Sequence, residues 1–262
     1  MKQTFETLTV TVDDAIARVT FNREKDTNAF SRKMTLDLLE VCMQIAADGR
    51  ASEPRVNALV LTGGTGRSFS VGGDFNDVST LATEPEVRAY LAEIIDLYIA
   101  ILRVEVPVVS AIDKFAIGQG LQVALMTDWR IGSTGCQLQM PELKNGVACP
   151  LGSLILELLF GRGKMLELVL DCEFIDAKAS LAHGLVNRLT SPEDLQASAM
   201  ETARRFAAYP RTSFVATKRI QNQRFVDAMQ GVREGSSRAH VEAFLRKTGS
   251  KHFDRVLGRA HA

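Results

Sequence analysis

The chain has 262 residues, with 31 Lys and Arg against 31 Asp and Glu, so its formal net charge at pH 7 is zero. A balanced charge gives no general electrostatic attraction to nucleic acid, and an anionic ligand must be held by local hydrogen-bond donors. The length fits one domain of moderate size, or a compact core with a smaller appendage.

The cysteines and the hydropathy pattern exclude further classes of protein. Cys42, Cys136, Cys149 and Cys172 are scattered, with no Cys-x-x-Cys motif or Cys/His cluster. This spacing argues against a metal site and against a disulfide framework. No segment approaches the roughly 20 apolar residues that span a bilayer, and the N-terminal residues lack the apolar run of a signal peptide. We expect a cytoplasmic protein with reduced thiols and no membrane partner.

In chain order, strands and helices are predicted to alternate. Residues 8–21 show two alternating apolar runs around Asp13-Asp14, which is typical of a β-hairpin. Helical spacing follows over 34–48, and then a short buried strand over 57–62. A second helix is predicted over 85–103 and a second buried strand over 107–112. Such alternation indicates crossover connections and a mainly parallel, buried sheet.

The C-terminal part is predicted to be helical only. From about Ser191 onward the pattern indicates helices over 192–208, 212–229 and 232–246. We therefore predict a strand-helix core over 1–190 and an all-helical segment over 191–262.

Two glycine-bearing segments follow predicted strands. Residues 68–75 read Ser-Phe-Ser-Val-Gly-Gly-Asp-Phe, and residues 116–122 read Ala-Ile-Gly-Gln-Gly-Leu-Gln before a helix predicted over 121–126. Glycine lets a ligand approach the backbone closely, and the first N–H groups of a helix attract an anion or a developing oxyanion. The second segment lacks the third glycine of a dinucleotide-binding motif. Taken alone, the first segment is also typical of a tight turn.

A polar pair stands out in apolar or glycine-rich surroundings: Gln122 and, twenty residues later, Glu142 in the run Met140–Lys144. A polar group in such surroundings costs free energy unless it has a partner or a function. Taken alone, Glu142 is typical of a helix first turn, and His240 of a packed histidine. An amide neither donates nor accepts a proton as an acid or base at neutral pH, so the pair holds only one group for proton transfer.

In order and spacing these segments resemble the crotonase superfamily, the relatives of enoyl-CoA hydratase and isomerase, over nearly the whole chain. The resemblance implies a ββα-repeat spiral core, a helical C-terminal segment that forms trimers, and acyl-CoA thioester substrates without a permanently bound cofactor. It places the two N–H donors of an oxyanion hole at Gly73 and Gln119. Relatives commonly have glycine at the second position, so the Gln119 side chain is a departure that brings a carboxamide toward the pocket.

Hydratases of the superfamily use two glutamates, and the resemblance places Gln122 at the first position and Glu142 at the second. Ordinary hydration is therefore disfavoured. Several strings resemble a subgroup, the carboxymethylproline synthases of carbapenem biosynthesis: Arg67–Asn76, Ile95–Tyr98, Met140–Lys144, Thr217–Arg219 and Asn28–Arg32. This subgroup decarboxylates malonyl-CoA, adds the enolate to the cyclic imine pyrroline-5-carboxylate, and hydrolyses the thioester. Loss of CO2 forms an enolate without a general base, and a second carboxylate would repel the malonyl carboxylate.

The resemblance also implies individual roles. Gln122 orients the malonyl carboxylate or the imine, and Glu142 orients the imine or activates the hydrolytic water. His240 pairs with the carboxylate of the imine, and Tyr90 occupies the position of an aromatic pocket residue. CoA contacts are implied for basic residues of the early loop and for the first glycine segment, namely Arg23, Lys25, Arg32, Ser70, Gly72, Asp74 and Phe75.

Two other functions stay open at this point. One acid also suffices for a double-bond isomerase, or for a decarboxylase that simply protonates its enolate. A CoA-binding scaffold without activity is the alternative outside catalysis, although Glu142 and both glycine segments argue against it. Homotrimer and dimer of trimers are both compatible with the resemblance, and the physiological imine or alkylated malonyl-CoA is not specified.

Overall fold

The computed structural model describes residues 4–51 and 54–245. It begins with the predicted hairpin, in which β1 (Leu8–Asp13) pairs antiparallel with β2 (Ile16–Phe21). Helix α1 (Arg32–Asp48) starts where the Ser31 hydroxyl accepts a hydrogen bond from the backbone N–H of Met34 at 3.2 Å, an N-cap that fixes the first turn. These elements confirm the first part of the predicted order.

A six-stranded sheet runs through the core in the order β1-β2-β3-β4-β6-β9. Its remaining strands are β3 (Ala58–Thr62), β4 (Val108–Ile112), β6 (Trp129–Ser133) and β9 (Arg188–Thr190). Every pair after the hairpin is parallel, and β3 and β4 are buried throughout, as their continuous apolar runs predict. A second sheet, of order β5-β7-β8, contains β5 (Phe115–Ile117), β7 (Gln137–Gln139) and β8 (Ile175–Asp176).

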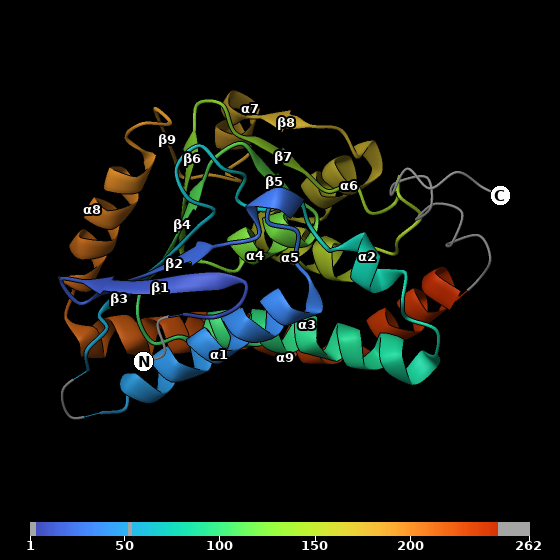
Figure 1. The fold of residues 1–262 in the computed structure, drawn as a ribbon, viewed down its shortest axis with the longest axis horizontal. Coiled ribbons are helices and arrows are strands. Elements are labelled where there is room, and N and C mark those ends of the chain that lie inside the picture. Colours follow the sequence, from blue (N-terminus) through green and yellow to red (C-terminus); the bar gives the residue numbers. More distant parts are fainter. Residues whose placement is uncertain (1–3, 52–53, 246–262) are drawn as a thin grey trace.

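Helices cover both faces of the larger sheet. On one face α8 (Leu195–Ala207) packs on side chains such as Val60 and Val109, and the other face meets the main core with α1 and α3 (Glu84–Arg103) (Figure 1). The shorter helices are η1 (Glu24–Asp26), α2 (Phe75–Val78), α4 (Gln119–Leu125), α5 (Pro150–Phe160), α6 (Arg162–Asp171) and α7 (Ala177–Ala182).

The C-terminal part differs from the prediction in one respect. Residues 211–245 form a single helix, α9 (Arg211–Leu245), so the predicted break between 229 and 232 is wrong. An added Cβ at Gly231 would meet nothing within 4 Å, and a glycine inside a helix costs only about 1 kcal/mol. Packing of α9 along α3 offsets that cost (Figure 1). The last residue of the predicted third helix, 246, lies outside the described residues, and the trimer-forming role of segment 191–262 stays a prediction.

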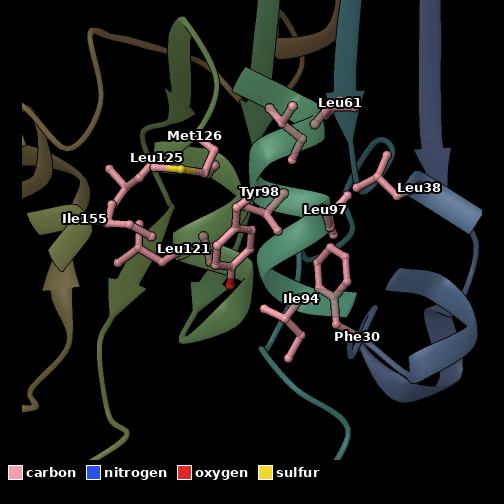
Figure 2. Close-up of a cluster of buried hydrophobic side chains, with 14 of the residues drawn as sticks. Phe30, Leu38, Leu61, Ile94, Leu97, Tyr98, Leu121, Leu125, Met126 and Ile155 are labelled. Carbon is pink, nitrogen blue, oxygen red and sulfur yellow. The ribbon is translucent and has the colours of Figure 1, made fainter. Parts of the chain in front are cut away.

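Helices α3, α4 and α5 meet in one apolar cluster. Tyr98 of α3 lies between Leu97 of the same helix, Leu121 of α4 and Ile155 of α5 (Figure 2). This cluster fixes α3, α4 and α5 relative to one another. The four cysteines are buried with free thiols, and none of the helices in the described residues is both long and apolar enough to cross a membrane.

Candidate active site

The two glycine segments, about 45 residues apart in the chain, meet through a short parallel bridge. The Ser70 N–H donates to the carbonyl of Phe115 at 2.9 Å, and the Ile117 N–H donates to the carbonyl of Ser70 at 3.0 Å. Glycine is required for this approach: a Cβ on Gly72, whose φ is +98°, would lie 2.9 Å from the Ile117 carbonyl oxygen. The tight-turn interpretation of the first segment is thus incomplete, because its turn is shaped to fit the second segment.

The backbone N–H groups of Gly73 and Gln119 are free donors. Within residues 4–51 and 54–245 neither N–H has a hydrogen-bond acceptor. Gln119 is the first residue of α4, so its N–H also carries the positive end of the helix dipole. The position of a Cβ on Gly72 lies 3.6 Å from the Gln119 nitrogen, which shows how closely the segments approach. Two preorganised N–H groups of this kind can stabilise one developing oxyanion.

Both donors open into one pocket with an empty volume of about 780 Å³, part of it open to solvent. Helices α3, α4, α5 and α9 and the turn after β7 form its walls. The pocket brings together every residue predicted for catalysis or substrate binding, namely Gly73, Tyr90, Gln119, Gln122, Glu142 and His240. Largely apolar walls with a few convergent polar groups are typical of a small-molecule site.

A hydrogen-bonded chain crosses the base of the pocket. The Tyr98 hydroxyl donates to Oε1 of Gln122 at 2.9 Å, and Nε2 of Gln122 donates to Oε1 of Glu142 at 2.7 Å. Both ends of the Gln122 carboxamide are therefore engaged within the protein. Sequence reasoning gave Tyr98 no role, although a hydroxyl on an otherwise apolar helix face was a signal that could have pointed to it.

Glu142 lies in a turn over 142–146, so the helix first-turn interpretation is wrong. Its Oε2 atom is buried and makes no hydrogen bond with the described residues. Burial raises the pKa of Glu142 to about 7, against smaller opposing effects of its own backbone N–H, the Gln122 amide and the nearby Cys149 thiol. Near neutral pH the carboxyl group therefore exists in both protonation states, as a general acid or base requires.

His240 is placed on α9 at the pocket wall. Its Nδ1 atom lies 2.8 Å from the carbonyl oxygen of Ser236, so Nδ1 carries the proton and donates it. Burial lowers the pKa of His240 below its ordinary value, which makes the neutral ring the main form at pH 7. In that form Nε2 is an acceptor, and pairing with a substrate carboxylate requires that the ring gain a proton when the substrate binds.

Gln119 and Tyr90 flank the first oxyanion donor. Oε1 of Gln119 and the Tyr90 hydroxyl lie 3.4 and 3.5 Å from the position of a Cβ on Gly73. Nε2 of Gln119 donates to the Thr35 hydroxyl over 3.4 Å, which turns the carboxamide along the wall of the pocket. The departure at this position therefore adds a polar surface beside Gly73.

The residues predicted to contact CoA are largely engaged inside the protein. Arg23 forms an ion pair with Asp74 at 2.8 Å, and Arg32 forms a two-point ion pair with Glu93 at 2.8 and 2.6 Å. Lys25 is exposed.

The remaining members of this group belong to the first glycine segment. Ser70 is fully buried and its hydroxyl accepts from the Gly72 N–H at 3.1 Å, while Asp74 accepts from the Asn76 N–H and so begins α2. Phe75 lines the pocket. Ser70 and Asp74 thus shape the turn, and contacts with CoA stay predictions.

A largely apolar pocket with two free N–H donors and one ionisable acid defines a class of enzyme that stabilises an oxyanion or enolate. The sequence profile of the enoyl-CoA hydratase/isomerase family matches residues 11–255, and the chain belongs to this family, the crotonase superfamily. The predicted fold is thereby confirmed.

Individual proteins are similar to this chain over most of its length. The chain is 34% identical over 248 residues to a carboxymethylproline synthase of Pectobacterium carotovorum subsp. carotovorum, covering 95% of this chain and 97% of that protein. It is 30% identical to an (E)-benzylidenesuccinyl-CoA hydratase of Thauera aromatica, covering 80% of each. The structure of ThnE from S. clavuligerus is similar with a TM-score of 0.75 and 30% identity, covering 92% of this chain and all of that one.

Gly118 provides a first test of this geometry. It adopts φ +50°, ψ −120° immediately before α4, and a Cβ there would lie 3.2 Å from Oε1 of Glu142. We expect Gly118→Ala to lower stability by about 1–3 kcal/mol through backbone strain. We also expect turnover of the CoA substrate to fall by about tenfold or more, because the methyl group displaces the carboxyl group. Urea unfolding and steady-state kinetics measure the two effects.

Gly66→Ala is the matched control, since Gly66 also has a positive φ of +69° but nothing lies within 4 Å of an added Cβ. It should lower stability and leave turnover unchanged. Full activity of Gly118→Ala would show that the approach of Glu142 to this glycine is not needed.

Proposed function

We propose that this protein makes a carbon–carbon bond from malonyl-CoA and a cyclic imine amino acid, pyrroline-5-carboxylate, and releases carboxymethylproline. The relative named carboxymethylproline synthase supports this reaction by its similarity over nearly the full length of both chains. The observation that carries the proposal is the chain from Tyr98 through Gln122 to Glu142, in which an amide takes the place of a second acid.

In the first step the bond between the malonyl α-carbon and its carboxylate breaks. CO2 leaves, and the electron pair moves through the α-carbon to the thioester oxygen. The N–H groups of Gly73 and Gln119 hold the resulting enolate oxygen, and each such donor is worth roughly 2.7–4 kcal/mol in other oxyanion holes. No base takes part, so the step needs no second carboxylate.

In the second step the enolate carbon bonds to the imine carbon, and the electron pair of the C=N bond moves to the nitrogen, which carries a proton. Ionised Glu142 stabilises the cationic imine, and His240 meets the imine carboxylate after gaining a proton. In the third step water attacks the thioester carbon and gives a proton to Glu142. The C–S bond then breaks, Glu142 returns that proton to the sulfur, and CoA leaves as the thiol. Gln122 acts by holding Glu142, a revision of its predicted role as a direct substrate contact.

The proposal also includes the assembly of the chains, their location in the cell and the binding of CoA. The helical C-terminal segment 191–262 joins chains into a homotrimer or a dimer of trimers, and the enzyme works in the cytoplasm in carbapenem-type antibiotic biosynthesis. The CoA moiety is held near the first glycine segment and the early loop, without a permanently bound cofactor.

The second candidate is an acyl-CoA decarboxylase, or an enoyl-CoA isomerase or hydratase, that uses the same oxyanion hole. The single ionisable carboxyl of Glu142 favours the decarboxylase or the isomerase as well, because one acid is enough to protonate an enolate. Other relatives are named enoyl-CoA hydratases, including one of Mycobacterium avium that is 34% identical over 195 residues.

One incubation separates these candidates. The purified protein is given malonyl-CoA with and without pyrroline-5-carboxylate, and the products are identified by mass spectrometry. We expect a carboxymethylated amino acid and free CoA when the imine is present. Acetyl-CoA as the sole product under both conditions identifies a decarboxylase. No turnover of malonyl-, crotonyl- or methylglutaconyl-CoA, with CoA binding retained, identifies a scaffold.

A further inference from the structure

Tyr98 is fully buried in the middle of α3, and its ring is surrounded by apolar side chains (Figure 2). Its hydroxyl makes one hydrogen bond within the described residues, the bond to Oε1 of Gln122 at 2.9 Å. A buried hydroxyl without a partner costs about 1–3 kcal/mol, so this bond is strongly favoured over the alternatives.

The Gln122 carboxamide has two possible orientations that differ by a half turn. In the observed one, Oε1 accepts the Tyr98 proton and Nε2 faces Glu142. In the reversed one, Nε2 would face Tyr98, the Tyr98 proton would have no acceptor, and Oε1 would face the carboxyl group. The reversed orientation is compatible only with protonated Glu142, because two acceptors cannot share a hydrogen bond.

We infer that Tyr98 is a positioning residue that holds the Gln122 amide in one orientation and so makes Oε2 of Glu142 the oxygen that carries the carboxyl proton. With Nε2 donating to Oε1 of Glu142 at 2.7 Å, Oε1 is an acceptor in both protonation states. The proton, when present, resides on Oε2, the atom without a hydrogen bond in the described residues. The amide donor also favours the carboxylate and opposes the effect of burial.

Glu142 is also the group in this environment that ionises near neutral pH. The titratable groups around it are Tyr90 and Tyr98 on α3, Cys149 at the start of α5, and His240 on α9. Burial raises the pKa of both tyrosines and of the thiol, and lowers the pKa of His240, so all four are mainly neutral at pH 7. A change in the pH profile near neutrality therefore reports on Glu142.

The test is Tyr98→Phe, with Tyr209→Phe as the matched control because Tyr209 is half-exposed and stacks on Phe206 outside the pocket. Without the hydroxyl, the amide can turn its oxygen toward protonated Glu142. We expect the pKa of Glu142 to rise by about one unit, since the proton is then stabilised. Thioester hydrolysis should fall about fivefold at pH 7 and recover at higher pH, while KM for malonyl-CoA changes less than about threefold.

The kinetic readout rests on the proposed function, so a second readout uses no substrate. Infrared difference spectra across pH, with those of Glu142→Gln subtracted, follow the Glu142 carboxyl directly. An upward shift in Tyr98→Phe alone supports the inference whichever CoA ester is turned over. An unchanged titration in a folded Tyr98→Phe protein overturns it.

Gln122→Met completes the experiment because it removes the amide through which Tyr98 acts. It should raise the pKa of Glu142 by a similar amount, and adding Tyr98→Phe to it should change nothing further. Additive shifts would show that Tyr98 acts on Glu142 by another route and would overturn the inference.

Discussion

Glu142→Ala should abolish formation of the carboxymethylated product while leaving malonyl-CoA binding almost unchanged. Removing a general acid or base typically lowers the rate by about 10²–10⁴-fold, and we expect a loss in this range. The dissociation constant should change by less than about threefold, because the oxyanion donors and the apolar walls are intact. Product release measured by mass spectrometry and binding measured by calorimetry separate the two effects.

The same variant also divides the reaction into its steps. Because loss of CO2 needs no base, Glu142→Ala should still convert malonyl-CoA to acetyl-CoA. Glu173→Ala is the control, since Glu173 is an exposed acid paired with Lys144 of the neighbouring loop. Retained product formation would remove Glu142 from the mechanism, and loss of decarboxylation with intact binding would place it in the first step.

The rate of hydrolysis should follow the ionised fraction of Glu142. Its folded-state pKa is raised to about 7, so the base form grows as the pH rises through this value. We therefore expect the hydrolysis rate to climb between about pH 6 and pH 8 while decarboxylation stays level. Rates of CoA release and CO2 release, measured in parallel, check this difference; a hydrolysis rate independent of pH would argue against Glu142 as the base.

The architecture could be predicted because it depends on patterns within each segment. Continuous apolar runs over 57–62 and 107–112 indicate buried parallel strands, and these became β3 and β4. Continuity of α9 could not be predicted in this way. Gly231 is locally unfavourable in a helix, and only the long contact of α9 with α3 decides the outcome.

The candidate site, like the fold, could be predicted only in part from the sequence. The places of the two glycine segments, Gln122 and Glu142 in the site could be predicted, because the resemblance to the family depends on the order of these segments in the chain. The hydrogen-bond partners within the site could not be predicted from this order. Tyr98, for example, reaches Gln122 only when α3 packs against α4. The ion pairs of Arg23 and Arg32 likewise join residues 51 and 61 positions apart. A basic residue in a loop therefore shows its partner only in the folded chain.

Gln122→Glu should reduce the turnover of malonyl-CoA and introduce hydration of a double bond. It places a second carboxyl group beside Glu142, where the present amide nitrogen lies 2.7 Å from Oε1. Two carboxyl groups at such a distance titrate as a coupled pair, and one of them keeps its proton to high pH. An acid and a base then face the same pocket, which hydration of a double bond requires. We expect measurable hydration of crotonyl-CoA and a loss of about tenfold or more in malonyl-CoA turnover by charge repulsion.

Gln122→Met distinguishes the added charge from the lost amide. It should slow malonyl-CoA turnover because Glu142 loses its donor, yet it offers no second acid and should not hydrate crotonyl-CoA. If Gln122→Glu turns over malonyl-CoA as well as the wild type, repulsion of the malonyl carboxylate is not the reason for an amide here. The bond to Tyr98 would not explain the amide either, since a protonated carboxyl group accepts that bond equally well.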